Sequence, residues 1–519
     1  MWKKEITKSV RRKRLFRLVA LVLLAIVAFP LYHTYQYLKS DRKLRSYIKH
    51  TTIPAVANRM FGADQKDSTF LLSHTAPLDF DQIALQIEDS IWNLLQNDLD
   101  NKLATPHIIQ NNINPWRVAV IRYKGEDMPC KVKLRGDTRD NYQYGLKNAT
   151  FRINLQGDKT IKNCKKFSLI RPFHENGLYG MIYYDYARKS GILSNEFEFV
   201  SVDLRNEKSG VWIFQEAFHS AMLANQKAGK GLILKFENDC NERSNVYNAS
   251  GFPKIIAYNM GSVREDSALH HQFQLAVRNL QELHVGKTQL SEVLDLDLWA
   301  NFVAINDLFY GHHSMTCHNM RLYYNPKSNK IEPVAWDPFC YRFLPYSHPH
   351  QYFASQKMGV SPIYSQLQAD SDFNNQYKLA LKKLVNNKSL DTYLAECVEM
   401  NKVIGPLLHR PIVTPGFDLQ VIEETRKVLK LQLYTMHPLR VNVFKNEHKI
   451  EIMNTSLLPV YCEKCVLEDT VIIVDKVITE SAEVHHNLSD SEDVYCVFRH
   501  NLLDSMLVEQ GEIYDVKVD

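Results

Sequence analysis

The sequence predicts an α+β protein with a core of antiparallel strands plus helices. One transmembrane helix precedes this core, and a helical segment and a small β-sandwich-like domain follow it. Two observations predict the core: short alternating strand patterns separated by glycines fill residues 116–157, and helical patterns follow them. A third observation, an apolar run near the N-terminus, predicts the transmembrane helix. At about 150 residues per domain, a chain of 519 residues holds several such units.

The first 17 residues are strongly basic. Their eight lysines and arginines face one acid, Glu5, so the rest of the chain carries a net charge near −2 although the whole chain carries +5. A nucleic-acid-binding protein concentrates its positive charge on the folded domain, so we expect no nucleic-acid partner. A basic N-terminal segment is instead typical of the cytoplasmic flank of a membrane helix.

The apolar run LVALVLLAIVAFPLY occupies residues 18–32. Counted from Leu15, it is just long enough to span about 30 Å of hydrocarbon. The alternative is a cleaved signal peptide, although Ala25 and Ala28 make a poor cleavage site. We therefore expect a single-pass membrane protein whose N-terminus is cytoplasmic and whose bulk is extracytoplasmic.

Local patterns predict the remaining elements in order. A helix is expected over residues 80–103, strands follow from residue 116, and a helix over 178–190 ends at Gly191. A hairpin with its turn at residues 206–210 comes next, then a helix over 298–309 with Asp295 or Asp297 near its N-cap. Residues 360–432 have helical patterns, and strand patterns return from residue 440. The predicted segments are a tail and anchor (1–40), a helical juxtamembrane region (41–112), the core (113–345), a helical extension (346–435) and a β-rich domain (436–519).

Nine cysteines are scattered along the chain, an odd number and too sparse for a disulfide scaffold. Cys462 and Cys465 form one CxxC motif. Without a second such motif the spacing disfavours a structural zinc site and favours a local disulfide or two free thiols.

Residues 307–337 (DLFYGHHSMTCHNMRLYYNPKSNKIEPVAWD) are the most informative segment. Two strand-like stretches, 320–324 and 331–336, flank a turn rich in Asn, Pro and Ser. If they pair as a hairpin, Asn319 and Asp337 lie at the same end. An amide oxygen and a carboxylate can together hold Mg²⁺ against nucleotide phosphates, although polar residues that merely cap a hairpin would give the same pattern.

The order of these segments resembles the CotH kinase family, named for spore coat protein H, whose members have an atypical protein-kinase-like fold. The similarity covers residues 115–345. The motifs that carry it are KLRG (133–136), KNATFRI (147–153), FSLIRPFHENGLYGMIYYDYARKSGI (167–192), GVWIFQE (210–216), NDLFYG (306–311), CHNMRLYY (317–324) and EPVAWD (332–337).

The resemblance implies ATP and Mg²⁺ as cofactors and phosphotransfer to hydroxyls of a surface or envelope protein. It implies that Asp337 holds Mg²⁺ and that Asn319 assists. Four further residues would handle nucleotide phosphates or their ion pairs: Lys147, Arg152, Glu216 and Lys235. Charges on an exposed strand face would account equally for the basic members of this set.

Two departures from the family pattern bear on catalysis. The usual W-D-x-D is Trp336-Asp337-Pro338-Phe339 here, and the place of the catalytic aspartate holds His313 and Ser314. Three alternatives stay open: Asp307 reaches the site as the base, His313 replaces it, or phosphotransfer is lost. In the last case the protein is a non-catalytic kinase-like scaffold in envelope, coat or surface-polysaccharide assembly, with the C-terminal β domain as its binding module.

Overall fold

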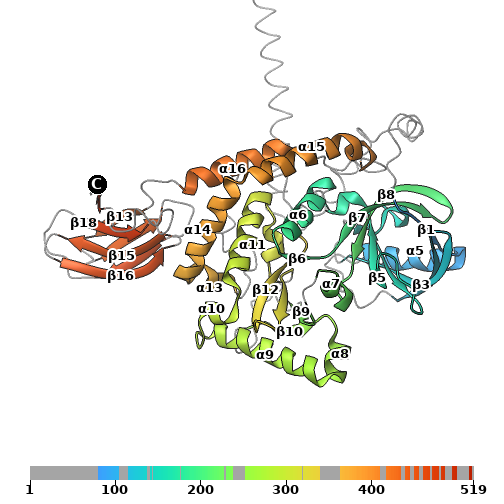
Figure 1. Cartoon of the computed structure of the whole chain (residues 1–519), viewed down its shortest axis with the longest axis horizontal. Helices are drawn as coiled ribbons and strands as arrows, with labels where there is room; N and C mark the ends of the chain where they lie inside the picture. Colours follow the sequence, from blue (N-terminus) through green and yellow to red (C-terminus); the bar gives the residue numbers. More distant parts are fainter. Residues whose placement is uncertain are drawn as a thin grey trace, which may run out of the picture.

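A computed structural model describes most of the chain from residue 80 onward (Figure 1). The predicted tail and membrane helix lie outside the described residues, within which no helix is both long and apolar enough to cross a bilayer. The described residues are 80–104, 115–136, 141–142, 144–175, 177–226, 229–237, 252–317, 319–338, 363–408, 417–433, 439–444, 449–454, 460–467, 470–478, 481–485, 494–499 and 513–516.

The first part of the described chain forms a closed barrel in the order β1-β2-β3-β4-β5-β8-β7. Its strands are β1 (Gln82–Gln86), β2 (Arg117–Tyr123), β3 (Glu126–Leu134), β4 (Phe151–Leu155), β5 (Lys166–Ile170), β7 (Phe197–Leu204) and β8 (Glu207–Glu216). Alternate residues point inward, and large apolar side chains such as Phe151, Phe167, Trp212 and Phe214 fill the interior. Each such burial contributes about 1.5–3 kcal/mol.

The helix predicted over residues 80–103 is wrong at its start. Residues 82–86 form β1, and helix α5 (Asp89–Ala104) begins only afterwards. The apolar residues Ile83, Leu85 and Ile87 recur at two-residue steps, which is the period of a strand. Strand β1 is antiparallel to β2 and parallel to β7, so these residues close the barrel.

The hairpin between β7 and β8 is confirmed, but its turn is tighter than predicted. The turn consists of Arg205 and Asn206, whose φ angles of 52° and 65° are both positive, as a two-residue hairpin turn requires. Gly210 lies inside β8 with φ 84°, opposite the register shift between Ser201 and Asp203 of β7.

A second sheet follows in the order β10-β9-β11-β12-β6. Its strands are β6 (Leu193–Ser194), β9 (Leu232–Phe236), β10 (Ile255–Ala257), β11 (Arg321–Asn325) and β12 (Lys330–Ala335). Strands β11 and β12 form the predicted hairpin. The predicted helix behind it is also confirmed as α11 (Leu296–Phe309), where the Asp295 carboxylate accepts a hydrogen bond from the Leu298 N–H at 3.1 Å. Trp299 Nε1 donates to the Ile331 carbonyl at 3.0 Å, which fixes α11 against β12.

Further helices surround this sheet, and the helical pattern of residues 360–432 is confirmed for its described part. Helices α14 and α16 pack against α11, and α15 packs against α6. Figure 1 shows the barrel on one side of these helices and the C-terminal strands on the other. The helices are α6 (Leu178–Lys189), α7 (Ser220–Asn225), α8 (Met260–Glu265), α9 (Ser267–His284), α10 (Leu290–Val293), α13 (Tyr364–Ala369), α14 (Ser371–Val385), α15 (Lys388–Leu408) and α16 (Leu419–Leu433), with 3₁₀ turns η5 (Leu146–Asn148), η6 (Pro172–Glu175) and η8 (His312–Met315).

The described C-terminal strands form two sheets, in the orders β13-β14-β17 and β16-β15-β18-β19. Their bounds are β13 (Leu439–Phe444), β14 (Lys449–Asn454), β15 (Val460–Leu467), β16 (Thr470–Ile478), β17 (Ser481–His485), β18 (Val494–Arg499) and β19 (Ile513–Val516). Cys462 of the CxxC motif is a buried free thiol on β15.

The strand assignment of residues 82–86 makes a stability prediction. Leu85 is fully buried inside the barrel, so Leu85→Ala should lower the free energy of unfolding by about 2–5 kcal/mol. Leu94→Ala is the matched control, because the Leu94 side chain on the outer face of α5 is 39% exposed. This substitution should change the free energy of unfolding by less than about 0.5–1 kcal/mol. Urea unfolding followed by circular dichroism measures both. Equal losses in the two variants would contradict the placement of β1 in the barrel wall.

Candidate functional site

The end of the β11–β12 hairpin brings Asn319 and Asp337 together, as predicted. The register pairs Arg321 with Val334, so the residues just before β11 and just after β12 lie at one end. Asp337 has a left-handed backbone with φ 46°, which is uncommon for a residue other than glycine. Its N–H donates to the Tyr184 hydroxyl at 2.9 Å, and the Tyr184 ring stacks on Phe197 at 3.8 Å. Helix α6 therefore holds Asp337 in this conformation.

The turn η8, directly after α11, carries His313. A Cβ atom at Gly311 would lie 2.4 Å from Asn306 Oδ1 and 2.7 Å from a ring carbon of Tyr183, so only glycine fits. The buried Asn306 Oδ1 accepts hydrogen bonds from the hydroxyls of Tyr183 and Ser314, both at 2.9 Å. This network fixes the turn and with it the position of His313.

His313 lies between the two hairpin residues. Its Nδ1 is 3.5 Å from Asp337 Oδ1 and 3.1 Å from the Asp337 carbonyl oxygen. The Asn319 amide nitrogen lies 2.8 Å from the same Nδ1. Asn319 is buried, whereas the Asp337 side chain is 39% exposed. The three side chains form one group that opens to solvent at the carboxylate.

A second carboxyl group, that of Glu175 on η6 between β5 and α6, lies close enough for Asp337 and His313 to affect its pKa. Arg171, just before η6, stacks on the Trp212 ring at 4.1 Å and donates to the Ser209 hydroxyl at 2.8 Å. A Cβ atom at Gly180 would lie 2.1 Å from the Glu175 carbonyl oxygen, so this glycine permits α6 to approach the turn closely.

The pKa values show that these groups interact. Burial raises the pKa of Glu175 to about 8, and the negative charge of Asp337 acts in the same direction, whereas Arg135 and His313 oppose it. Burial alone would lower the pKa of His313, but the charge and hydrogen bonds of Asp337 outweigh burial and raise it above its ordinary value. Two carboxyl groups therefore lie close enough to interact, with Arg135 and His313 as their cationic neighbours.

Cationic side chains lie on the aromatic rings beside this group. The guanidinium groups of Arg135 and Arg321 lie 5.4 Å and 5.6 Å from the centre of the Trp336 ring, next to Asp337. Arg321 also lies over the Tyr258 ring, and the Lys235 ammonium lies 5.7 Å from the same ring. Arg135 follows β3 of the barrel, whereas Arg321 and Lys235 lie on β11 and β9. The site therefore lies where the barrel meets the second sheet.

Asp307, the other candidate base, has a different environment. Its side chain is 1% exposed within α11. One carboxylate oxygen lies 2.6 Å from His312 Nε2, and the other accepts a hydrogen bond from the Tyr377 hydroxyl of α14. These contacts connect α11, η8 and α14, so Asp307 has the surroundings of a buried structural carboxylate.

Lys147 and Arg152 lie on the barrel. The Lys147 ammonium pairs with the Glu207 carboxylate at 2.6 Å, and both side chains are mostly exposed. Arg152 lies on the outer side of β4, where it pairs in register with Lys133 of β3. Its positive charge helps to lower the pKa of Lys133, after the larger effect of burial. The two residues therefore belong to the barrel surface and are not in the hydrogen-bond group of His313.

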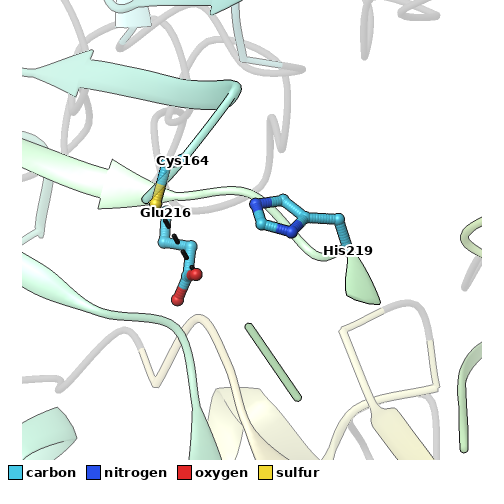
Figure 2. A group of neighbouring side chains, drawn as sticks. All are labelled: Cys164, Glu216 and His219. Atoms are coloured by element: carbon cyan, nitrogen blue, oxygen red, sulfur yellow. Dashed lines mark hydrogen bonds between the residues drawn. The ribbon is translucent and has the colours of Figure 1, made fainter. Parts of the chain in front are cut away.

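Glu216, at the end of β8, lies with Cys164 and His219 (Figure 2). It is almost fully buried, and the Cys164 thiol donates to its Oε1 at 3.6 Å. Burial raises the pKa of this thiol, and the charge of Glu216 acts in the same direction. Glu216 is thus part of a second group of side chains, separate from that of His313.

Sequence reasoning missed Glu175, Arg135 and Arg321 as site residues. All three lie in motifs that were recognised, namely HENG, KLRG and HNMRLYY, but they come from distant segments of the chain. A close-packed glycine beside each turn is the signal that could have marked both turns as fixed structures. Gly180 lies beside the HENG turn, and Gly311 lies beside η8.

The described chain thus contains a barrel, a larger lobe of sheet and helices, and a group of polar side chains with neighbouring arginines where the two meet. The family described as CotH kinase protein has a model that matches residues 121–417, which is more than half of the chain. The chain therefore belongs to the CotH kinase family, and the resemblance inferred from its motifs is confirmed. No curated protein matches the chain.

Proposed function

We propose that this protein transfers the γ-phosphoryl group of ATP, with Mg²⁺, to hydroxyl groups of a surface or envelope protein. The observation that carries the proposal is the meeting of Asp337, Asn319 and Glu175 beside the arginines on Trp336. Oxygen donors of this kind suit Mg²⁺, because a hard cation prefers carboxylate and amide oxygens. Bound there, Mg²⁺ would neutralise phosphate charge and bridge phosphate oxygens.

In this proposal the cationic side chains of the protein bind the nucleotide phosphates. Arg135 and Arg321 are suited to hold phosphate oxygens, because a guanidinium group offers several N–H donors in one plane. Their stacking on Trp336 orients both groups before any ligand binds. Lys235, beside Arg321 in the sheet, adds a further positive charge. Lys147 and Arg152 retain a role only if the nucleotide extends over the barrel.

His313 is the better-supported base. Its Nδ1 lies 3.1 Å from the Asp337 carbonyl oxygen, and the Asn319 amide nitrogen lies 2.8 Å from Nδ1 and 3.1 Å from Nε2, so the imidazole belongs to the Asp337 group, where a base would act. Asp307 makes short contacts to His312 and Tyr377 in the interior, and a proton from a substrate would have to reach it through them. The charge of Asp337 favours the imidazolium that forms when His313 takes up the proton.

An exported, membrane-anchored location completes the proposal. The basic segment and apolar run of residues 1–32 support it. The disulfide at Cys317, two residues before Asn319, also supports it, because disulfides persist in oxidising compartments outside the cytoplasm.

A non-catalytic scaffold is the second candidate. The burial of Asp307 favours it, because the only aspartate near the family's usual base position serves the interior packing of α11 and α14. In that case the kinase-like lobe would serve envelope, coat or surface-polysaccharide assembly, with the C-terminal strands as its binding module.

The role of Asp337 can be tested with Asp337→Asn. Asparagine keeps the shape and tolerates the left-handed backbone, but it removes the charge that would face Mg²⁺. At a concentration of ATP 100 times its Kd, Mg²⁺-dependent stabilisation of the parent should be about 2.7 kcal/mol, and the variant should lose it. Thermal-shift titration with ATP and Mg²⁺ measures this change.

The matched control for this test is Asp203→Asn, which removes an exposed carboxylate that accepts a hydrogen bond from Gln82 on the barrel. It should retain the full stabilisation. Equal stabilisation of the parent and Asp337→Asn would rule out the metal-binding role of Asp337.

The identity of the base predicts the pH dependence of activity. If His313 is the base, transfer should fall on the acid side as the imidazole protonates, at a pKa near 6.5 that Asp337 moves upward and bound Mg²⁺ moves downward. If Asp307 is the base, Asp307→Asn and not His313→Gln should abolish transfer. Autophosphorylation of the parent, His313→Gln and Asp307→Asn between pH 4 and 9 distinguishes them, with circular dichroism as the check on folding. Transfer that is absent from the parent at every pH, despite ATP binding, would favour the scaffold.

A further inference from the structure

Three donor side chains of different chemistry meet at the end of β8. A sulfur of Cys164, a carboxylate oxygen of Glu216 and a ring nitrogen of His219 all lie within 4.8 Å of one another. Figure 2 shows the Cys164 thiol beside the Glu216 carboxylate, with the His219 ring next to them on a neighbouring segment. We propose that Cys164, Glu216 and His219 bind a zinc-class divalent cation, at a site distinct from the group around Asp337.

Cys164 is held rigidly. Its backbone N–H donates to the Ile161 carbonyl at 2.8 Å, and its own carbonyl accepts the Ile161 N–H at 3.0 Å. The two residues between them, Lys162 and Asn163, have positive φ angles of 51° and 61°, as a tight turn of this kind requires. The sulfur is therefore placed before any ion binds.

Glu216 is oriented in the same way. Its Oε2 accepts the Glu196 N–H at 3.2 Å, and its carbonyl accepts a hydrogen bond from the Asn195 amide at 2.8 Å. This leaves Oε1 directed at the sulfur, 3.6 Å away. Zinc bonds of about 2.3 Å to sulfur and 2.1 Å to oxygen at a tetrahedral angle place those two atoms about 3.6 Å apart. The sulfur and Oε1 have this separation, and the His219 ring nitrogen lies within 4.8 Å of both atoms.

The donor set selects the metal. Thiolate and imidazole ligands suit zinc and other transition metals, whereas Mg²⁺ prefers oxygen ligands in octahedral geometry. Three protein ligands leave a fourth tetrahedral position for water. The Glu196 N–H on the second carboxylate oxygen is the kind of outer contact that orients a metal ligand.

Such an ion would tie the barrel to the second sheet. Cys164 lies between β4 and β5, Glu216 ends β8, and His219 precedes α7. Helix α7 packs its Met222 and Leu223 against the sheet strands β9, β11 and β12. The neighbour of His219, Phe218, lies 4.8 Å from the Trp336 ring and 4.6 Å from that of Tyr258. An ion held by His219 would therefore also fix the aromatic rings that carry Arg135 and Arg321.

The test is the binding of Zn²⁺ and Co²⁺ to the purified full-length protein. Elemental analysis after dialysis against Zn²⁺ and removal of the excess should find a zinc ion that Cys164→Ser and His219→Gln lose. Cobalt in place of zinc should give a sulfur-to-cobalt charge-transfer band that disappears in Cys164→Ser. Cys130→Ser removes another buried free thiol, on β3, and should keep both the zinc and the band. Zinc should raise the Tm of the parent and of this control only.

His219 is half-buried, so His219→Gln is the variant that should fold most readily, and circular dichroism checks this. Mg²⁺ in place of Zn²⁺ should not produce the increase in Tm that zinc binding at this site produces. The proposal is overturned if the parent binds no zinc or cobalt. It is also overturned if folded Cys164→Ser and His219→Gln bind as much as the parent, in which case the thiol only donates a hydrogen bond to Glu216.

Discussion

The left-handed backbone of Asp337 is the constraint on which the site depends. A non-glycine residue in this conformation costs about 1–3 kcal/mol and persists only where its surroundings impose it. Here the Tyr184 hydroxyl accepts the Asp337 N–H, and Tyr184 is fixed on α6 by its stacking with Phe197. The chain leaves β12 at this residue, so the same contact that holds the backbone directs the carboxylate toward His313 and Asn319.

The second feature of the site is the electrostatic interaction between its two carboxyl groups. Asp337 is close enough to Glu175 for its charge to oppose the ionisation of Glu175, and burial together with this charge raises the pKa of Glu175 to about 8. This shift favours the neutral form of the Glu175 carboxyl group. A divalent cation would reverse this balance by favouring both carboxylates in their charged forms. Arg135 and Arg321, over the Trp336 ring, supply positive charge beside these carboxyl groups.

The sequence predicted those parts of the site that depend on local pattern. The β11–β12 hairpin follows from two strand patterns around one turn, and α11 follows from its apolar period and the Asp295 cap. Strand β1 was missed because Ile83, Leu85 and Ile87 also fit the helical period of α5. Its strand conformation is imposed by pairing with β2 and with β7, which lies more than a hundred residues away.

Long-range contacts explain what the sequence could not supply. Arg135 and Glu175 precede Trp336 by far in the chain, and only the meeting of the barrel with the second sheet brings them together. Lys147 and Glu216 also lie in recognised motifs. In the structure, Lys147 pairs with Glu207, whereas Glu216 accepts a hydrogen bond from Cys164. A motif fixes the order of residues, and only tertiary packing decides which of them share a site.

Calorimetric titration of the purified protein with ATP, with and without Mg²⁺ and with AMP for comparison, tests whether the Asp337 group binds a nucleotide. We expect saturable binding of ATP that requires Mg²⁺, and much weaker binding of AMP, because AMP lacks the outer phosphates that Arg135 and Arg321 would hold. No binding of ATP under either condition, or equal binding of AMP and ATP, would contradict the assignment of the Asp337 group as a nucleotide site.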